Sequence, residues 1–297
     1  MFRAYTALIL LGVIWGSNFI FMKWATALIT PSQTVFLRVL FGFIPLALIA
    51  WRSKVITREQ LAYLPHFIVM SVLATSFYYY GFVAGTALLP SSIAGLLSGS
   101  IPIFTFVGAA IFLPDERPSK QMALGVALGF AGIALSTRPW QGSMNISLIG
   151  ALWMLAGSLS VGAAFVYVRR FLSHLKLPPL ALATWQTGIA VMTLAVLIDF
   201  DGITHIATDA QALWGTVLGL GILGTGAAFL IYYFIIETLG SVRAAGATYI
   251  APIVAVVIGA IIGESITYVE IIALLLILCG VLLIQTGRKK VAPVNKT

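Results

Sequence analysis

Long apolar segments, separated by short polar turns, follow one another along almost the whole chain. Each segment holds about 20 predominantly apolar residues, the length a helix needs to cross roughly 30 Å of hydrocarbon. The turns are too short to contain a soluble domain. The pattern predicts an all-α membrane protein with ten transmembrane helices, at residues 5–28, 32–51, 63–88, 91–113, 119–137, 147–168, 179–198, 211–237, 241–263 and 268–286.

The composition narrows the class of protein further. Hydrophobic residues make up 60% of the chain and charged residues 9%, and the mean hydropathy is +1.05, which excludes a soluble globular domain. The formal charge of +8 does not indicate nucleic-acid binding, because no basic stripe with interleaved aromatic residues is present. The single cysteine, Cys279, excludes a disulfide framework and a thiolate metal site. Without an acidic metal cluster or a phosphate-binding loop, we expect no cofactor.

The basic residues lie in alternate turns. They are Arg3, Arg52, Lys54, Arg58, Arg117, Lys120, Arg169, Arg170, Lys176, Arg243 and those of the tail 288–297. The opposite turns hold almost no Lys or Arg beyond Arg138, and residues 199–209 are acidic. The positive-inside bias therefore predicts that both termini lie in the cytoplasm, and the first apolar segment reads as a retained helix rather than a signal peptide.

One stretch of the chain occurs twice. Residues 91–132 and 241–280 each form an apolar helix with a proline, a polar turn with a glutamate, and a second apolar helix. The matched pairs are Ala94 with Ala244, Ser98 with Thr248, Pro102 with Pro252, Glu116 with Glu264, Lys23 with Arg169, Arg38 with Gln186, and Phe82 with Tyr232. The unit is thus five helices, at 1–138 and 147–287, followed by a cytoplasmic basic tail at 288–297. An odd number of spans inverts the second copy, an arrangement typical of secondary transporters with a substrate site between the halves.

The two prolines are candidate hinges. A proline within a helix frees the carbonyl four residues earlier, and here these carbonyls belong to Ser98 and Thr248. In lipid, a freed carbonyl is tolerated where protein or a water-filled cavity serves it. The two helices therefore line a transport path, or each carries a packing kink relieved by its own hydroxyl.

Glycine pairs at Gly12 and Gly16, Gly81 and Gly85, and Gly125 and Gly129 indicate close helix packing. The run 219–224 formally matches a dinucleotide-binding motif, but it lies inside an apolar helix without a preceding strand. We interpret it as a packing surface.

The segment WGSNFIFMKWA at 15–25, Arg38, and the two copies that end in Glu116 and Glu264 resemble the EamA repeat of the drug/metabolite transporter superfamily. Within it, the chain is similar to YddG-like amino-acid exporters. The resemblance covers nearly the whole chain. It implies ten helices in two inverted repeats, a bacterial inner-membrane location, and a central cavity lined by the third, fourth, eighth and ninth helices. The first copy departs from the family at 114–116, where Pro-Asp-Glu replaces the more usual Gly-Glu.

Polar and aromatic residues within the spans are the candidates for substrate contact. They are Trp15, Asn18, Arg38, Tyr78, Phe82, Ser98, Trp153, Trp185, Gln186, Tyr232, Thr248 and Tyr249. Arg38 is the only strong charge well inside a span. It could attract a carboxylate, hold a helix carbonyl or snorkel to the surface. Asn18 needs a partner on a substrate or another helix, and Lys23, nearer its helix end, is expected to snorkel.

These features predict a secondary transporter that exports small amphipathic metabolites, with aromatic or neutral amino acids as the leading candidates. Since no carboxylate or histidine lies well inside a span, we expect facilitated passage by a monomer or weak dimer. The alternatives are drug or other metabolite efflux by proton antiport, a non-transporting subunit, receptor or scaffold, and an intramembrane lipid-modifying enzyme. The last would need an acid–base pair or metal that the sequence does not offer.

Overall fold

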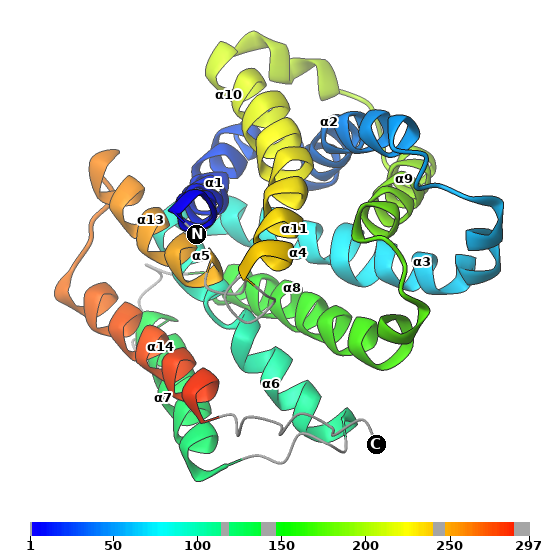
Figure 1. Cartoon of the computed structure of the whole chain (residues 1–297). Coiled ribbons are helices and arrows are strands. Elements are labelled where there is room, and N and C mark those ends of the chain that lie inside the picture. The colour runs from blue at the N-terminus through cyan, green and yellow to red at the C-terminus, as the bar shows by residue number, and fades with distance from the viewer. Residues whose placement is uncertain (1, 114–118, 138–146, 240–246, 288–297) are drawn as a thin grey trace, which may run out of the picture.

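The computed structural model describes residues 2–113, 119–137, 147–239 and 247–287, and every regular element in these ranges is helical (Figure 1). The elements are α1 (Phe2–Thr26), α2 (Pro31–Arg52), η1 (Arg58–Tyr63), α3 (Leu64–Ser71), η2 (Val72–Ser76), α4 (Phe77–Leu88), α5 (Ser91–Ser98), α6 (Ile101–Phe112), α7 (Lys120–Thr137), α8 (Leu148–Tyr167), η3 (Val168–Leu172), η4 (Ser173–Leu175), α9 (Pro179–Leu197), η5 (Ile203–Thr208), α10 (Ala210–Trp214), η6 (Gly215–Ala227), α11 (Ala228–Leu239), α13 (Ala247–Ile261) and α14 (Tyr268–Thr286).

The predicted all-α membrane fold is confirmed. Within the described ranges, nine helices are long and apolar enough to cross a membrane, and each coincides with one predicted span. The shorter apolar helix α13 occupies the ninth predicted span, whose first residues, 241–246, lie outside the described part of the chain. Glu116, Arg117, Arg138, Arg243 and the basic tail also lie outside it.

Side chains at the turns fix where several helices begin. Thr30 and Gln33 form a reciprocal capping box at the start of α2, and Pro31 occupies the first helical turn. Thr267 and Glu270 form the same motif at the start of α14. Asp209 accepts a hydrogen bond from the backbone N–H of residue 212 in α10. These caps satisfy backbone donors that the helices themselves leave unpaired.

Most contacts between two helices have a counterpart between the equivalent helices of the other repeat. α1 packs along α13, and its counterpart α8 packs along α6. Likewise α11 packs along α1, and α4 along α8. Three pairs map onto themselves: α2 with α9, α5 with α13, and α7 with α14, the last side by side at the lower left of Figure 1. This is the arrangement expected of two inverted repeats.

The predicted glycine pairs lie at helix–helix contacts. Gly12 and Gly16 meet α13, Gly81 and Gly85 meet α8, and Gly125 and Gly129 face α14 and Ile103 respectively. An added Cβ at any of them would come too close to the neighbouring helix. The glycine-rich run 219–224 lies in the π-helical segment η6 and packs against Phe21, Phe41 and Asn18. Both packing interpretations are confirmed.

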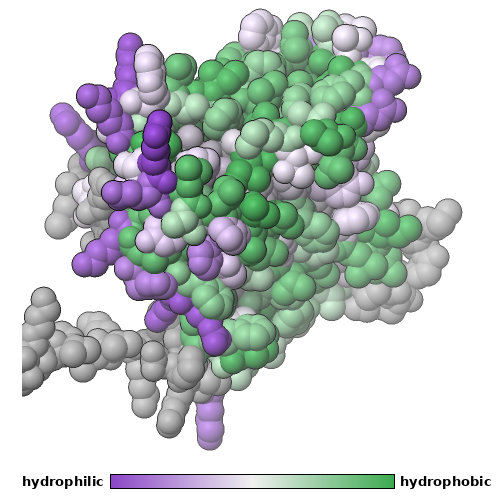
Figure 2. Space-filling view, turned by 90° about the vertical axis from the view of Figure 1, so that its right-hand side faces the viewer, coloured by the Kyte–Doolittle hydropathy of each residue, from purple (hydrophilic) through white to green (hydrophobic). Residues whose placement is uncertain are grey.

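The surface agrees with a position in a bilayer. Figure 2 shows hydrophobic residues over a broad central band, with hydrophilic residues gathered towards opposite edges. Large apolar side chains such as Val196, Ile261 and Ile111 are 84%, 78% and 68% exposed. Such exposure of many aliphatic side chains is what a lipid-facing surface requires.

Candidate functional site

Helices α5 and α13 cross at the centre of the contacts between the two repeats. Gly95 faces Ala255, Gly99 faces Pro252, and Ser92 faces Gly259, so the helices run antiparallel in close contact. We call the end of the molecule where α4 meets α5, at residues 86–92, the junction end. The crossing is closed from this end to Pro252. Beyond Gly99 the chain continues as α6, which packs along α8.

The two prolines have different local effects. In the first copy the helix ends at Ser98, residues 99 and 100 form a turn, and α6 starts at Ile101, one residue before Pro102. In the second copy α13 continues through Pro252. The Ser98 hydroxyl donates to the carbonyl of Gly95 at 2.6 Å rather than to its own. The interruption expected in both copies therefore occurs in one, where Gly99 and Ser100 permit the turn.

Arg38 is buried in a cluster of neutral groups, and it does not snorkel. Its Nε donates to Oγ1 of Thr225 at 3.2 Å, and its Nη1 lies 3.8 Å from the sulfur of Met22. The guanidinium carbon lies 3.8 Å from the ring centroid of Tyr79, a cation–π geometry. With its amide oriented to satisfy both neighbours, Asn18 accepts from Nη2 of Arg38 at 3.2 Å and donates to the carbonyl of Ile14 at 3.1 Å.

This Arg38 cluster joins α1, α2, α4 and η6, and three of its members, Met22, Thr225 and Tyr79, were not among the predicted substrate contacts. Thr225 lies in the π-helical segment η6, and its hydroxyl also donates to the carbonyl of Leu220 at 3.0 Å. Tyr79, rather than Tyr78, provides the ring beneath the guanidinium. The repeat offset offered one signal for Thr225, because Thr75 occupies the equivalent position in the π-helical segment η2. For Tyr79 the sequence held no signal, since three consecutive tyrosines give no preferred face.

Tyr78 and Phe82 belong to an aromatic group next to this cluster. Their ring centroids are 4.7 Å apart, and Phe82 lies 6.0 Å from Phe19 of α1. Phe82 is 3% exposed and packs against Gly157, whereas Tyr78 is only partly buried. Of the pair, Tyr78 is therefore better placed to meet a ligand.

The other predicted residues lie in separate places. Trp15 pairs with Tyr232, with ring centroids 5.8 Å apart. Trp153 lies 5.3 Å from the ring of Tyr80. Tyr249 accepts a hydrogen bond from Gln285 of α14. Thr248 is partly buried on the first turn of α13.

Trp185 has a contact typical of a structural residue. Its Nε1 donates to Gln60 at 2.8 Å, and its ring stacks on Phe67 at 5.6 Å. The neighbouring Gln186 is buried in α9. The predicted set thus divides between the Arg38 cluster, the α5–α13 crossing and peripheral aromatic contacts.

The ammonium group of Lys23 reaches the end of the neighbouring helix α4. Its Nζ donates to the backbone carbonyls of Thr86, Ala87 and Leu89, at 3.3, 3.2 and 2.8 Å. These carbonyls are at the end of α4, where the partial negative charge of the helix end favours a positive charge.

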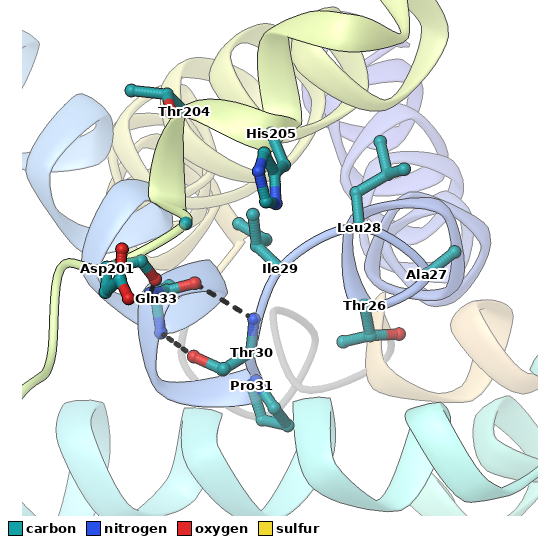
Figure 3. A pocket seen from close by; sticks show the side chains of 11 residues that line it. Thr26, Ala27, Leu28, Ile29, Thr30, Pro31, Gln33, Asp201, Thr204 and His205 are labelled. Carbon is teal, nitrogen blue, oxygen red and sulfur yellow. Dashed lines mark hydrogen bonds between the residues drawn. The ribbon is translucent and has the colours of Figure 1, made fainter.

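A surface pocket of about 640 Å³ lies between the α1–α2 turn and the segment 201–205 (Figure 3). Gln33 lines it and donates from Nε2 to the carbonyls of Asp199 and Asp201, at 2.9 and 2.7 Å. His205 lies above Ile29 in this view. None of the predicted substrate contacts lines this pocket, which is built from interhelical turns.

Comparison with known proteins agrees with this arrangement. The sequence profile of the EamA-like transporter family matches residues 2–138 and 148–286. The chain belongs to the EamA-like transporter family. It is 26% identical over 284 residues to the uncharacterized transporter YoaV of Bacillus subtilis, covering 95% of this chain and 96% of that protein. It is 25% identical over 291 residues to a probable amino-acid metabolite efflux pump of Salmonella typhimurium, covering 92% and 91%.

A solved crystal structure has the same fold, with a TM-score of 0.63, 18% identity, and coverage of 98% of this chain and 99% of that one. EamA-like proteins carry two repeats of five helices, which agrees with the exchange of contacts described above. The chain is therefore a multi-pass membrane protein of a transporter family.

Proposed function

We propose that this EamA-like transporter carries aromatic or neutral amino acids out of the bacterial cytoplasm, across the inner membrane, by facilitated alternating access. Both termini lie in the cytoplasm and the junction end faces outside. This orientation follows the positive-inside bias of the turns. The substrate is held near the midplane, where the two repeats meet.

The observation that carries this proposal is the close crossing of α5 and α13 at the junction end. The helices are in contact from the junction end to Pro252, and from there α6 packs along α8. An asymmetry between the repeats accompanies it. Arg38 bonds Thr225, whereas the hydroxyl of the equivalent Thr75 is buried without a hydrogen-bond partner among the described residues. Two equivalent repeats in different states are what an alternating-access carrier needs.

The Arg38 cluster supports a substrate that carries a carboxylate. The buried guanidinium contacts a hydroxyl, an amide, a thioether and an aromatic ring, all neutral groups, and a carboxylate is the best-matched ligand for it. The aromatic group at Tyr78 and Phe82 adds apolar surface beside it. The printed name of the Salmonella relative, a probable amino-acid metabolite efflux pump, agrees with such a substrate.

The positions of the acidic residues support facilitation. The carboxylates whose side chains the structure describes lie in turns or first helical turns: Glu59, Asp199, Asp201, Asp209, Glu264 and Glu270. A carboxylate that carries protons across a membrane would be expected within a span.

The test is uptake of labelled phenylalanine and leucine by the purified protein in liposomes, with and without an imposed pH gradient. We expect uptake that is saturable and indifferent to the gradient, with phenethylamine, which lacks the carboxylate, a poor competitor. Uptake driven by the gradient would replace facilitation with proton antiport. Absence of uptake for every amino acid would overturn the proposed substrate class.

The aromatic side chains near the crossing provide a second test. Tyr78→Ala and Tyr249→Ala should change the ratio of phenylalanine to leucine uptake, because each removes ring surface from the proposed path. Tyr268→Ala is the matched control, since Tyr268 is 75% exposed at the start of α14. An unchanged ratio in both variants would assign these tyrosines to packing.

A further inference from the structure

The junction between α4 and α5 leaves backbone groups that neither helix can pair. α4 ends at Leu88 and α5 begins at Ser91, so residues 89 and 90 alone connect them. The last carbonyls of α4 and the first amides of α5 therefore point towards the same short connection without intrahelical partners. At the edge of a bilayer such groups need protein partners or water.

Lys23 meets the carbonyl side of this junction. Its ammonium group donates to the three carbonyls of Thr86, Ala87 and Leu89. Lys23 lies on α1, within the same repeat as α4 and α5. It holds the end of α4 against α1.

Glu264 meets the amide side, and it comes from the other repeat. One carboxylate oxygen accepts from the backbone N–H and the hydroxyl of Ser91, at 2.7 and 2.8 Å. The other accepts from the backbone N–H of Ser92 at 2.9 Å and from the Ser92 hydroxyl. Glu264 lies in the turn between α13 and α14, directly after Gly263, whose φ of +86° lets the chain reverse.

These hydrogen bonds keep Glu264 charged. Burial acts to raise the pKa of its carboxyl, but the hydrogen bonds from Ser92 and Ser91 outweigh this and hold the pKa below its usual value. An ordinary glutamate has a pKa of about 4.3. The carboxylate is therefore ionised, and its contacts are intact, at physiological pH.

The Glu264 contacts lie at the crossing of α5 and α13 itself. Ser92 and Gly259 face one another at the first contact of the α5–α13 crossing, and Glu264 closes over that contact. If α13 separates from α5 at the junction end, the carboxylate must leave Ser91 and Ser92. Four hydrogen bonds to a charged group are then lost together.

We propose that Glu264 and Lys23 form a latch that holds the junction end closed, with Glu264 binding the start of α5 across the repeats and Lys23 fixing the end of α4 behind it. Release of Glu264 from Ser91 and Ser92 is the step that opens this end. This inference does not depend on the identity of the substrate, because the latch contacts form without one.

The latch can be tested by electron paramagnetic resonance distances between spin labels at Leu88→Cys and Ile262→Cys, with Cys279 replaced by serine. Leu88 and Ile262 are 49% and 46% exposed and lie on opposite sides of the latch, so the labels do not enter the core. In the unaltered latch we expect a short distance. Glu264→Gln and Lys23→Gln should each shift the distribution to longer distances. Lys23→Arg, which retains the charge and several donors, should keep the short distance.

Two matched variants control for the loss of a charged cap. Glu270→Gln weakens the cap of its own helix α14, and Arg170→Gln removes a donor to the carbonyl of Phe112 at the opposite end of α6. Both should leave the Leu88–Ile262 distance unchanged. Folding is followed by monodispersity in detergent.

The outcomes separate a latch from a permanent structural cap. Well-folded Glu264→Gln and Lys23→Gln proteins with the original distance would overturn the proposal. Loss of monodispersity in both the Glu264→Gln and the Lys23→Gln protein would also overturn it, because the two residues would then stabilise the fold rather than one state. Since no substrate is present, the result stands whether or not amino acids are transported.

Discussion

At the scale of single residues, Arg38 carries the sharpest expectation. Arg38→Gln keeps a hydrogen-bond donor near Thr225 but removes the charge that a carboxylate would bind. A hydrogen bond to a charged group contributes about 1.5–3 kcal/mol, so amino-acid affinity should fall about tenfold or more. Competition by phenethylamine should change little. Equal losses for both ligands, measured by competition in liposomes, would instead assign Arg38 to structure.

Gly95 tests the closeness of the crossing. A methyl group at this position would overlap the side chain of Ala255, so Gly95→Ala should disfavour the closed crossing and lower thermal stability, by about 1–3 kcal/mol as for other overpacked contacts. Gly108→Ala is the control, because its Cβ would meet only Val166, at 3.3 Å. Thermal unfolding in detergent compares the two. Equal melting temperatures would show that the helices can separate without cost.

The residue scale also shows where sequence reasoning ends. Arg38 and Asn18 could be singled out because polar groups within a span need partners, but Thr225, the partner of Arg38, lies 187 positions further along the chain. The position of Lys23 near the end of α1 predicted an ammonium group at the edge of the bilayer, but the sequence did not reveal the carbonyls of α4 that bind it there. Glu264 was recognised as a repeat marker, and its role as a cap depends on a contact with Ser91 that no local pattern encodes.

At the scale of the helix, Pro252 is the element to alter. α13 continues through this proline at the point where it faces Gly99, and the missing backbone N–H of a proline removes one helical hydrogen bond, which gives the helix a place to bend. Pro252→Ala should reduce the transport rate severalfold while expression and thermal stability are retained.

The matched control for this prediction is Pro45→Ala, because Pro45 lies inside α2 and packs against Gly226, away from the crossing. It should leave the transport rate nearly unchanged. Normal transport by a well-folded Pro252→Ala protein would contradict the hinge.

Helices were predictable where hydrophobicity alone determines them, and less so where backbone geometry varies. The apolar runs located the spans because each must cover the hydrocarbon thickness. The π-helical segments η2, η3 and η6 were not foreseen, since one extra residue per turn leaves apolar composition unchanged. The helix breaks before Ile101 because Gly99 and Ser100 form a turn. The repeat could not reveal this break, since the second copy has a continuous helix at the equivalent position.

At the scale of the whole molecule, orientation is the testable property. With the positive-inside bias, both termini and the α2–α3 turn at residues 53–57 should face the cytoplasm, and the segment 199–209 should face outside. Protease sites inserted at 55 and at 204 should lie on opposite sides of the membrane. Protease added outside intact spheroplasts should then cut only the site at 204. Cleavage at 55 from outside would reverse the orientation and with it the proposed side of the junction end.

The pairing of opposite charges at the α4–α5 junction has a consequence for the membrane voltage. A potential of 100 mV acts on one charge crossing the membrane with about 2.3 kcal/mol. Lys23 and Glu264 lie at the same junction, so the release of Glu264 there, at one edge of the bilayer, moves little charge through the field. A zwitterionic amino acid adds none. The membrane potential should therefore have little effect on the balance between the closed and open states of this end. Uptake measured across a potassium diffusion potential would reveal any departure from this electrical neutrality.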